Sequence, residues 1–194
     1  MLRLAVPFVL AAVLTGCSST QPGTPTAGNQ TGGTPTTGTS AGTAPVDRPK
    51  AVDMKTLDPC SLYTPEVKAA LGVRIVTPRD PLAEYGEGSK TCTNTYEDRT
   101  YISAIYTLVN GGVDRLKRTT SETELTPVQI AGYPAYLNKV PQAGLGPGCD
   151  IYIDAHDGQL LLVDAIGDTK STMDATCEQA KKFANAVGAV LATK

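Results

Sequence analysis

The single histidine of the chain, His156, lies in an aspartate-rich stretch and is the natural candidate for acid–base chemistry. Asp154 and Asp157 lie close to it in sequence, so a carboxylate could orient the imidazole as a general base, as in a hydrolase. Alternation along a strand also places Asp150 on the same side as Asp154 and His156, which could form a set of metal ligands. Neither a nucleophile motif nor a second ligand cluster accompanies them. We therefore interpret His156 as a turn-flanking residue on a solvated strand and expect no catalytic residue and no metal site.

A second reactive residue is Cys17, which follows Leu14-Thr15-Gly16 and the apolar run Leu4–Val13. This run is shorter than the roughly 20 residues of a membrane-spanning helix, and it follows a positive charge at Arg3, as in a signal peptide. The small residue before Cys17 suits cleavage, and the thiol suits diacylglycerol transfer. The pattern predicts a lipoprotein signal peptide over residues 1–16. It also predicts a protein held on the outer face of the cytoplasmic membrane by palmitate or related chains on Cys17.

The segment that follows the cysteine consists largely of Thr, Gly, Pro, Ser and Ala, with few charges and few large apolar side chains. Such a composition cannot bury enough surface to offset the entropy of ordering the chain. We therefore expect residues 17–50 to be the lipidated cysteine and a disordered tether. The remaining residues, 51–194, have the length of one globular domain.

Four cysteines remain in the expected domain: Cys60, Cys92, Cys149 and Cys177. An even number of cysteines in an oxidising, exported location predicts two disulfides, for which three pairings exist. We favour Cys60–Cys92 and Cys149–Cys177 because each closes a separate loop of the domain. A zinc site fits poorly, because the chain has no C-x-x-C motif and one histidine.

Turn chemistry and hydrophobic spacing predict both helices and strands in the domain. Thr64 suits a helix N-cap, Pro65 the first helical position and Gly72 the end of a short helix. Alternation of side chains and the Asp157-Gly158 pair, which suits a tight primed turn, predict strands and a hairpin. The further expected elements are a strand over Arg99–Asn110, a brief helix over Gly112–Thr120, strands over Pro127–Ala131 and Ala135–Val140, a hairpin over Cys149–Val163 and a helix over Ser171–Thr193. These elements predict an α+β fold, with a mostly antiparallel sheet packed by a short N-terminal helix and a long C-terminal helix.

Several stretches resemble one family. The run Leu57–Glu66, LDPCSLYTPE, resembles the LDPCSLLTPEE opening of small actinobacterial exported lipoproteins classed as a domain of unknown function, DUF3558. The likeness continues through Thr126–Ala135, Gly148–Asp150, Asp157–Gln159 and Cys177–Ala180. The resemblance implies a lipid anchor, an actinobacterial cell envelope and a fold similar to PsbP and Mog1 proteins. It implies no enzymatic activity and no catalytic residues.

These features favour a non-catalytic binding or accessory lipoprotein of the cell envelope, without a cofactor. Its partner would be an envelope protein, a glycan or a small apolar ligand. Two alternatives remain: an envelope hydrolase using His156, and a lipid carrier with a cavity between the sheet and the C-terminal helix. A net charge of −2 gives no support to nucleic-acid binding. The short basic cluster of Arg115, Lys117 and Arg118 is expected to be a solvated face.

Overall fold

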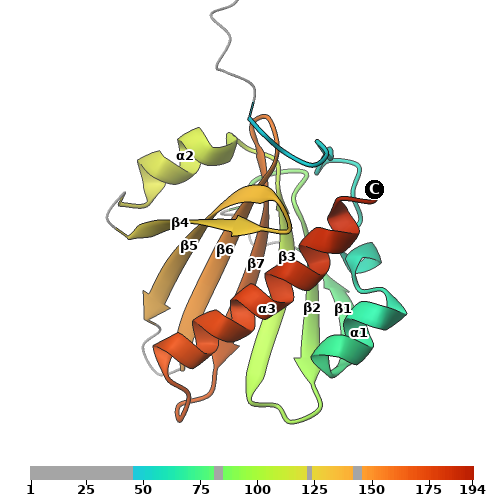
Figure 1. Cartoon of the computed structure of the whole chain (residues 1–194), viewed down its shortest axis with the longest axis vertical. Helices are drawn as coiled ribbons and strands as arrows, with labels where there is room; N and C mark the ends of the chain where they lie inside the picture. Colours follow the sequence, from blue (N-terminus) through green and yellow to red (C-terminus); the bar gives the residue numbers. More distant parts are fainter. Residues whose placement is uncertain (1–45, 81–84, 122–123, 142–145) are drawn as a thin grey trace, which may run out of the picture. The chain divides into compact units, whose positions relative to one another are not determined.

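A seven-stranded antiparallel sheet in the order β1-β2-β3-β7-β6-β5-β4 forms the centre of the fold (Figure 1). The computed structural model describes residues 46–80, 85–121, 124–141 and 146–194, so the expected signal peptide, Cys17 and most of the expected tether lie outside the described residues. The strands are β1 (Val73–Arg79), β2 (Lys90–Tyr96), β3 (Tyr101–Leu108), β4 (Leu125–Ile130), β5 (Tyr133–Pro141), β6 (Pro147–His156) and β7 (Gln159–Gly167).

The helices lie on both faces of this sheet. On one face, α3 (Met173–Leu191) crosses the strands diagonally, with α1 (Pro65–Leu71) and the 3-10 helix η1 (Pro59–Leu62) beside it (Figure 1). On the other face, α2 (Gly112–Thr119) packs against β6 and β7 through a small leucine cluster. The predicted α+β architecture, with a short early helix and a long final helix, is therefore confirmed.

Local hydrogen bonding explains the bounds of α1. The Thr64 hydroxyl accepts a hydrogen bond from the backbone N–H of Val67 at 3.3 Å, and Pro65 occupies the first helical position. Gly72 ends the helix in the left-handed conformation with φ of 66°, which glycine adopts without a steric penalty. The helix predicted from these residues is confirmed at both ends.

The main hydrophobic core fills the space between α3 and the sheet. Phe183 and Val187 of α3 and the paired residues Ile151 and Val163 of β6 and β7 are completely buried. The predicted apolar face of the last helix is confirmed, since its members Cys177, Ala180, Ala184, Val187 and Leu191 are all buried. Core side chains thus fill the space between these parts of α3 and the sheet, and the alternative of a lipid carrier stays a prediction.

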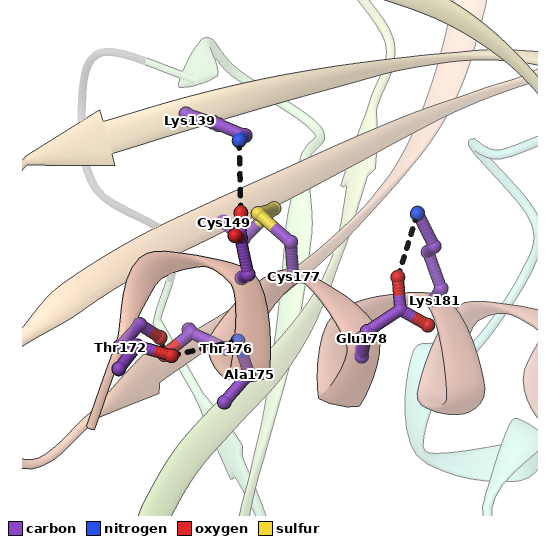
Figure 2. Close-up of a disulfide and its surroundings, with 9 residues drawn as sticks. Lys139, Cys149, Thr172, Ala175, Thr176, Cys177, Glu178 and Lys181 are labelled. Carbon is purple, nitrogen blue, oxygen red and sulfur yellow. Dashed lines mark hydrogen bonds and ion pairs between the residues drawn. A yellow bond between two sulfur atoms is a disulfide. The ribbon is translucent and has the colours of Figure 1, made fainter.

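Two disulfides join the helical layer to the sheet with the favoured pairing. Cys60 of η1 bonds to Cys92 of β2, and Cys149 of β6 bonds to Cys177 of α3. Figure 2 shows the second bond close to the N-terminus of α3, where the hydroxyl of Thr172 accepts a hydrogen bond from the backbone N–H of Ala175. Each bond closes a loop that includes strand residues, so both restrict the unfolded chain.

Three features of the strands differ from the sequence predictions. Strands β1 and β2 were not predicted, because the threonines and Pro78 in them mask any alternation of apolar residues. The turn between β4 and β5 is Ala131-Gly132, with φ of 48° and 86°, so β5 already begins at Tyr133. At Asp157-Gly158 only Gly158 has positive φ, 72°, and the pairing register shifts between Asp154 and His156. The expected primed turn would require positive φ at Asp157 too, or a glycine in its place.

Candidate functional site

The residues of the expected acid–base group gather at the tip of the β6–β7 hairpin, where Arg48 binds both carboxylates. Its Nη2 lies 2.8 Å from Asp154 Oδ1, its Nη1 lies 2.8 Å from Asp157 Oδ1, and its Nε donates to the carbonyl of Asp154 at 2.9 Å. His156 Nδ1 lies 3.2 Å from the backbone carbonyl of Asp157. The carboxylates of Asp154 and Asp157 therefore form ion pairs with Arg48, whereas the His156 imidazole forms its hydrogen bond with the main chain.

The Arg48–Asp154 pair is a partly buried structural contact. The two side chains are 9% and 10% exposed, whereas that of Asp157 is 86% exposed. Burial raises the pKa of Asp154, and the hydrogen bond from Arg48 opposes that rise. The same guanidinium lowers the pKa of Asp157. Sequence reasoning placed Arg48 in the tether and missed it, since no local pattern connects residue 48 with the hairpin.

Neither a metal cluster nor a membrane-spanning helix occurs in the described parts of the chain. Among residues 46–80, 85–121, 124–141 and 146–194, no three His, Cys, Asp or Glu side chains are grouped so that they could hold a metal ion. The set of Asp150, Asp154 and His156 considered from the sequence does not form such a group. None of the helices in these ranges is long and apolar enough to cross a membrane.

A different pair of carboxyl groups lies on the sheet face that carries α2. Asp150 of β6 and Asp164 of β7 are direct partners in the antiparallel register, and both are half-buried. The Tyr152 hydroxyl donates to Asp150 Oδ2 at 3.1 Å, and the Tyr106 hydroxyl donates to Asp164 Oδ2 at 3.2 Å. The backbone N–H of Ala104 donates to Asp164 Oδ1 at 2.5 Å. Each carboxyl group is thus held by a neighbouring tyrosine.

Burial brings the titration of both carboxyl groups towards neutral pH. Burial raises the pKa of Asp150 to about 6, although the hydrogen bond from Tyr152 opposes the rise. Burial, and then the negative charge of Asp150, raise the pKa of Asp164 to about 7. Two facing carboxylates repel each other, and protonation of one relieves that repulsion. The sequence indicated Asp150 as a candidate, but Asp164 was missed.

Next to this carboxyl pair, a pocket of about 330 Å³ opens between α2 and the sheet. Leu108 of β3 and Leu160 of β7 are register partners, and Leu116 of α2 packs in the same cluster. Tyr152 also lines the pocket, so one tyrosine contacts both the pocket and Asp150. The volume falls at the lower end of the roughly 300–1,000 Å³ typical of small-molecule sites.

The loop before β2 contributes a second aromatic wall. Tyr85 lines the pocket, and its ring lies 4.9 Å from the ring of Tyr106, centroid to centroid. Since Tyr106 donates to Asp164, the pocket connects to both carboxyl groups through tyrosines. Polar side chains at the edge of the pocket include Asn110, Arg115 and Thr119. The result is an apolar hollow with hydroxyl, amide and guanidinium groups at its rim.

The chain matches a family model over most of its length, and the match includes the Leu57–Glu66 motif. A family model described as "Protein of unknown function (DUF3558)" matches residues 12–189. The chain belongs to the DUF3558 family. Searches of curated proteins and of solved structures gave no significant match. The likeness to PsbP and Mog1 proteins therefore stays a prediction.

The residues of the DUF3558 motif, Leu57–Glu66, cap helices and form a disulfide in this chain. The Asp58 carboxylate accepts a hydrogen bond from the backbone N–H of Cys60 at 2.9 Å and caps η1. Cys60 is fixed to the sheet by its disulfide, and Thr64 caps α1 as described above. The motif thus encodes two helix starts and one cross-link. The pocket of this DUF3558 chain lies on the opposite face of the sheet.

The basic cluster on α2 divides between solvent and pocket. Lys117 and Arg118 are exposed in the last turn, and the Lys117 ammonium lies 5.4 Å from the centre of the Tyr136 ring. Arg115 is half-buried, lines the pocket and donates from Nη1 to the carbonyl of Asn110 at 3.2 Å. The prediction of a solvated cluster therefore needs correction at Arg115, which is half-buried and lines the pocket.

Proposed function

We propose that this DUF3558 protein is a lipid-anchored, extracytoplasmic binding module that holds a small, largely apolar ligand between α2 and the sheet. The pocket of about 330 Å³ is the observation that carries the proposal. Its leucines and tyrosines offer apolar surface, and a few polar groups at the rim can orient a ligand, as in typical small-molecule sites. The signal-peptide pattern that ends in Leu14-Thr15-Gly16-Cys17 supports the anchored, extracytoplasmic location.

A non-catalytic role agrees with the chemistry of the described side chains. The carboxylates near His156 form ion pairs with Arg48, and a general base needs an orienting partner that is free for that task. The carboxyl groups of Asp150 and Asp164 accept hydrogen bonds from the hydroxyls of Tyr152 and Tyr106. Binding at the pocket is the function that these contacts support best.

The proposal is tested by native mass spectrometry of the full chain isolated from the producing cells. We expect an additional non-covalent mass on the wild type. Thr119→Trp should abolish this mass. Thr119 is an exposed residue of α2 that lines the pocket, so a tryptophan there can fill the space that the ligand would occupy. Arg118→Trp is the matched control, since Arg118 is exposed on the same helix and should retain the ligand.

Two results would contradict the proposal. One is the absence of any bound mass on the wild type, isolated under conditions that keep the disulfides and the fold intact. The other is equal retention of the mass by Thr119→Trp and Arg118→Trp, which would place the ligand elsewhere on the protein. Circular dichroism of each variant establishes that the fold is present before the masses are compared.

A further inference from the structure

One end of the sheet face that carries α2 exposes apolar side chains to solvent. Helix α2 packs at the other end of this face, where Leu116 forms a cluster with Leu160 and with Leu108, its register partner. Alternate residues of β3 share a face, so Ile102 lies on the same face as Leu108. Ile102 is 58% exposed, and Ile75 of β1 is 51% exposed. They are two of the three large hydrophobic side chains that are exposed in the described parts of the chain, so such side chains concentrate here.

The strand register joins these side chains into one row across the sheet. Each member is the register partner of the next, and this apolar row consists of Ile75, Thr95, Ile102, Ile166, Gly148 and Val140. The row crosses six strands, from β1 to β5. Five strand spacings of about 4.8 Å give it a length of about 24 Å. A continuous exposed apolar patch on a soluble domain marks an interaction surface, whereas single exposed side chains do not.

The carboxyl pair lies beside the apolar row on the same face. Asp164 comes two residues before Ile166 in β7, and Asp150 comes two residues after Gly148 in β6. Among the ion pairs of the described residues, none joins a lysine or an arginine to Asp150 or Asp164. Arg79 shares this face by strand alternation, but it lies on β1, three strands away from Asp164. The face thus combines apolar surface with negative charge that no ion pair compensates.

We propose that the apolar row and the carboxyl pair form a docking surface for an amphipathic helix of another protein, with a lysine or an arginine beside its apolar stripe. A helix of about 16 residues has the length of the row, at about 1.5 Å per residue. Helix α3 already covers the opposite face of the sheet in this way, and apolar sheet faces are buried by a second layer. The cation would lie over Asp150 and Asp164 and would favour their ionised forms. The proposal does not depend on the pocket or on its ligand.

Charge favours this occupant over a membrane and over a second copy of the chain. An anionic lipid surface carries a negative potential, which would repel the two carboxylates. A second copy stacked on the same face would bring two further carboxyl groups to it, and like charges across an interface oppose association. A cationic helix is instead attracted by the pair, while its apolar stripe buries the exposed isoleucines.

The experiment compares three helical peptides of about 18 residues at pH 8. This pH is above the pKa values of Asp150 and Asp164, about 6 and about 7. One peptide has a leucine face and a lysine face, the second has glutamate in place of lysine, and the third has serine in place of leucine. The full chain carrying Cys17→Ser is titrated with each peptide, and the isoleucine methyl signals of the apolar row are followed by NMR. We expect the leucine–lysine peptide to bind about tenfold more tightly than either of the others.

Variants of the row and of the pair separate apolar contact from charge. Ile75→Thr combined with Ile102→Thr should weaken binding of the leucine–lysine peptide about tenfold, and threonine preserves the strands because it is also β-branched. Val46→Thr is the matched control, since Val46 is exposed but lies outside the sheet, and it should bind like wild type. Asp150→Asn combined with Asp164→Asn should remove most of the preference for lysine over glutamate. Circular dichroism establishes that each variant is folded.

Three results would overturn the proposal. The first is equal affinity of wild type for the lysine and glutamate peptides, because the carboxyl pair would then not select the partner. The second is unchanged affinity in the double threonine variant, which would place the peptide elsewhere on the protein. The third comes from two further titrations, with phosphatidylglycerol vesicles and with increasing concentration of the protein alone. Larger shifts of the isoleucine methyl signals in either of these than with the leucine–lysine peptide would assign the face to a membrane or to a second copy.

Discussion

Asp150 and Asp164 lie directly opposite each other across β6 and β7, each hydrogen-bonded to a tyrosine on the same sheet face. Such a pair of like charges destabilises a sheet when both groups are ionised. The fold keeps both groups there, half-buried, next to the pocket. The stability of the domain should therefore depend on pH through these two carboxyl groups.

The first prediction is that this contribution to stability falls as pH rises. The folded-state pKa values of about 6 for Asp150 and about 7 for Asp164 lie above the ordinary 3.8, so the folded state holds protons that the unfolded state has lost. The stabilising contribution is complete below about pH 4 and disappears as pH rises through about 6 to 7. Urea unfolding at pH 5 and pH 8 should differ by on the order of 2–4 kcal/mol.

Asparagine variants give the control for that pH dependence. Asp150→Asn with Asp164→Asn preserves the shape and removes the titration, so the free energy of unfolding should become nearly flat between pH 5 and pH 8. The single variant Asp164→Asn should remove the larger part of the pH dependence, since the pKa of Asp164 is raised more than that of Asp150. Equal pH dependence in wild type and double variant would show that other groups cause it.

The second prediction concerns Arg48. Arg48→Met leaves the Asp154 carboxylate buried without its partner, which should destabilise the domain by about 3 kcal/mol. Asp157→Asn removes the exposed half of the same contact and should cost less than about 1 kcal/mol. Unfolding in urea at pH 7 measures both. Similar losses in the two variants would mean that burial of Asp154 does not govern the energetics of this cluster.

The third prediction separates the binding module from the envelope hydrolase. His156→Ala should change the free energy of unfolding by less than about 0.5 kcal/mol, because its hydrogen bond is on the exposed hairpin tip. The bound mass seen by native mass spectrometry should also persist. The hydrolase would instead be favoured if the His156→Ala protein folds normally but the strain that produces it shows the phenotype of a gene deletion.

The fourth prediction addresses the anchor. The wild-type protein should fractionate with membranes and carry the mass of at least two acyl chains on the peptide that begins at Cys17. Cys17→Ser should lose those chains and leave the membrane fraction, and an inhibitor of lipoprotein signal peptidase should leave the leader attached. Identical masses and fractionation for wild type and Cys17→Ser would exclude lipidation at this residue.

Local chemistry in the sequence determined several parts of this protein. Thr64, Pro65 and Gly72 define α1 because capping and backbone conformation involve residues a few positions apart. The periodic small residues around Ala180 and Ala184 define the buried face of α3 in the same way. Family membership was also predicted from the opening motif and confirmed by the family model.

Contacts between distant parts of the chain were decided only by the tertiary structure. The facing of Asp150 and Asp164 depends on the register of β6 and β7, and the Arg48–Asp154 pair joins residues 106 positions apart. The pocket exists because α2 lies on the face opposite α3, while its lining comes from β3, β6, β7 and the loop before β2. Sequence patterns report which side chains share a strand or helix face, but the burial that shifts a pKa or forms a cavity arises where separate elements pack.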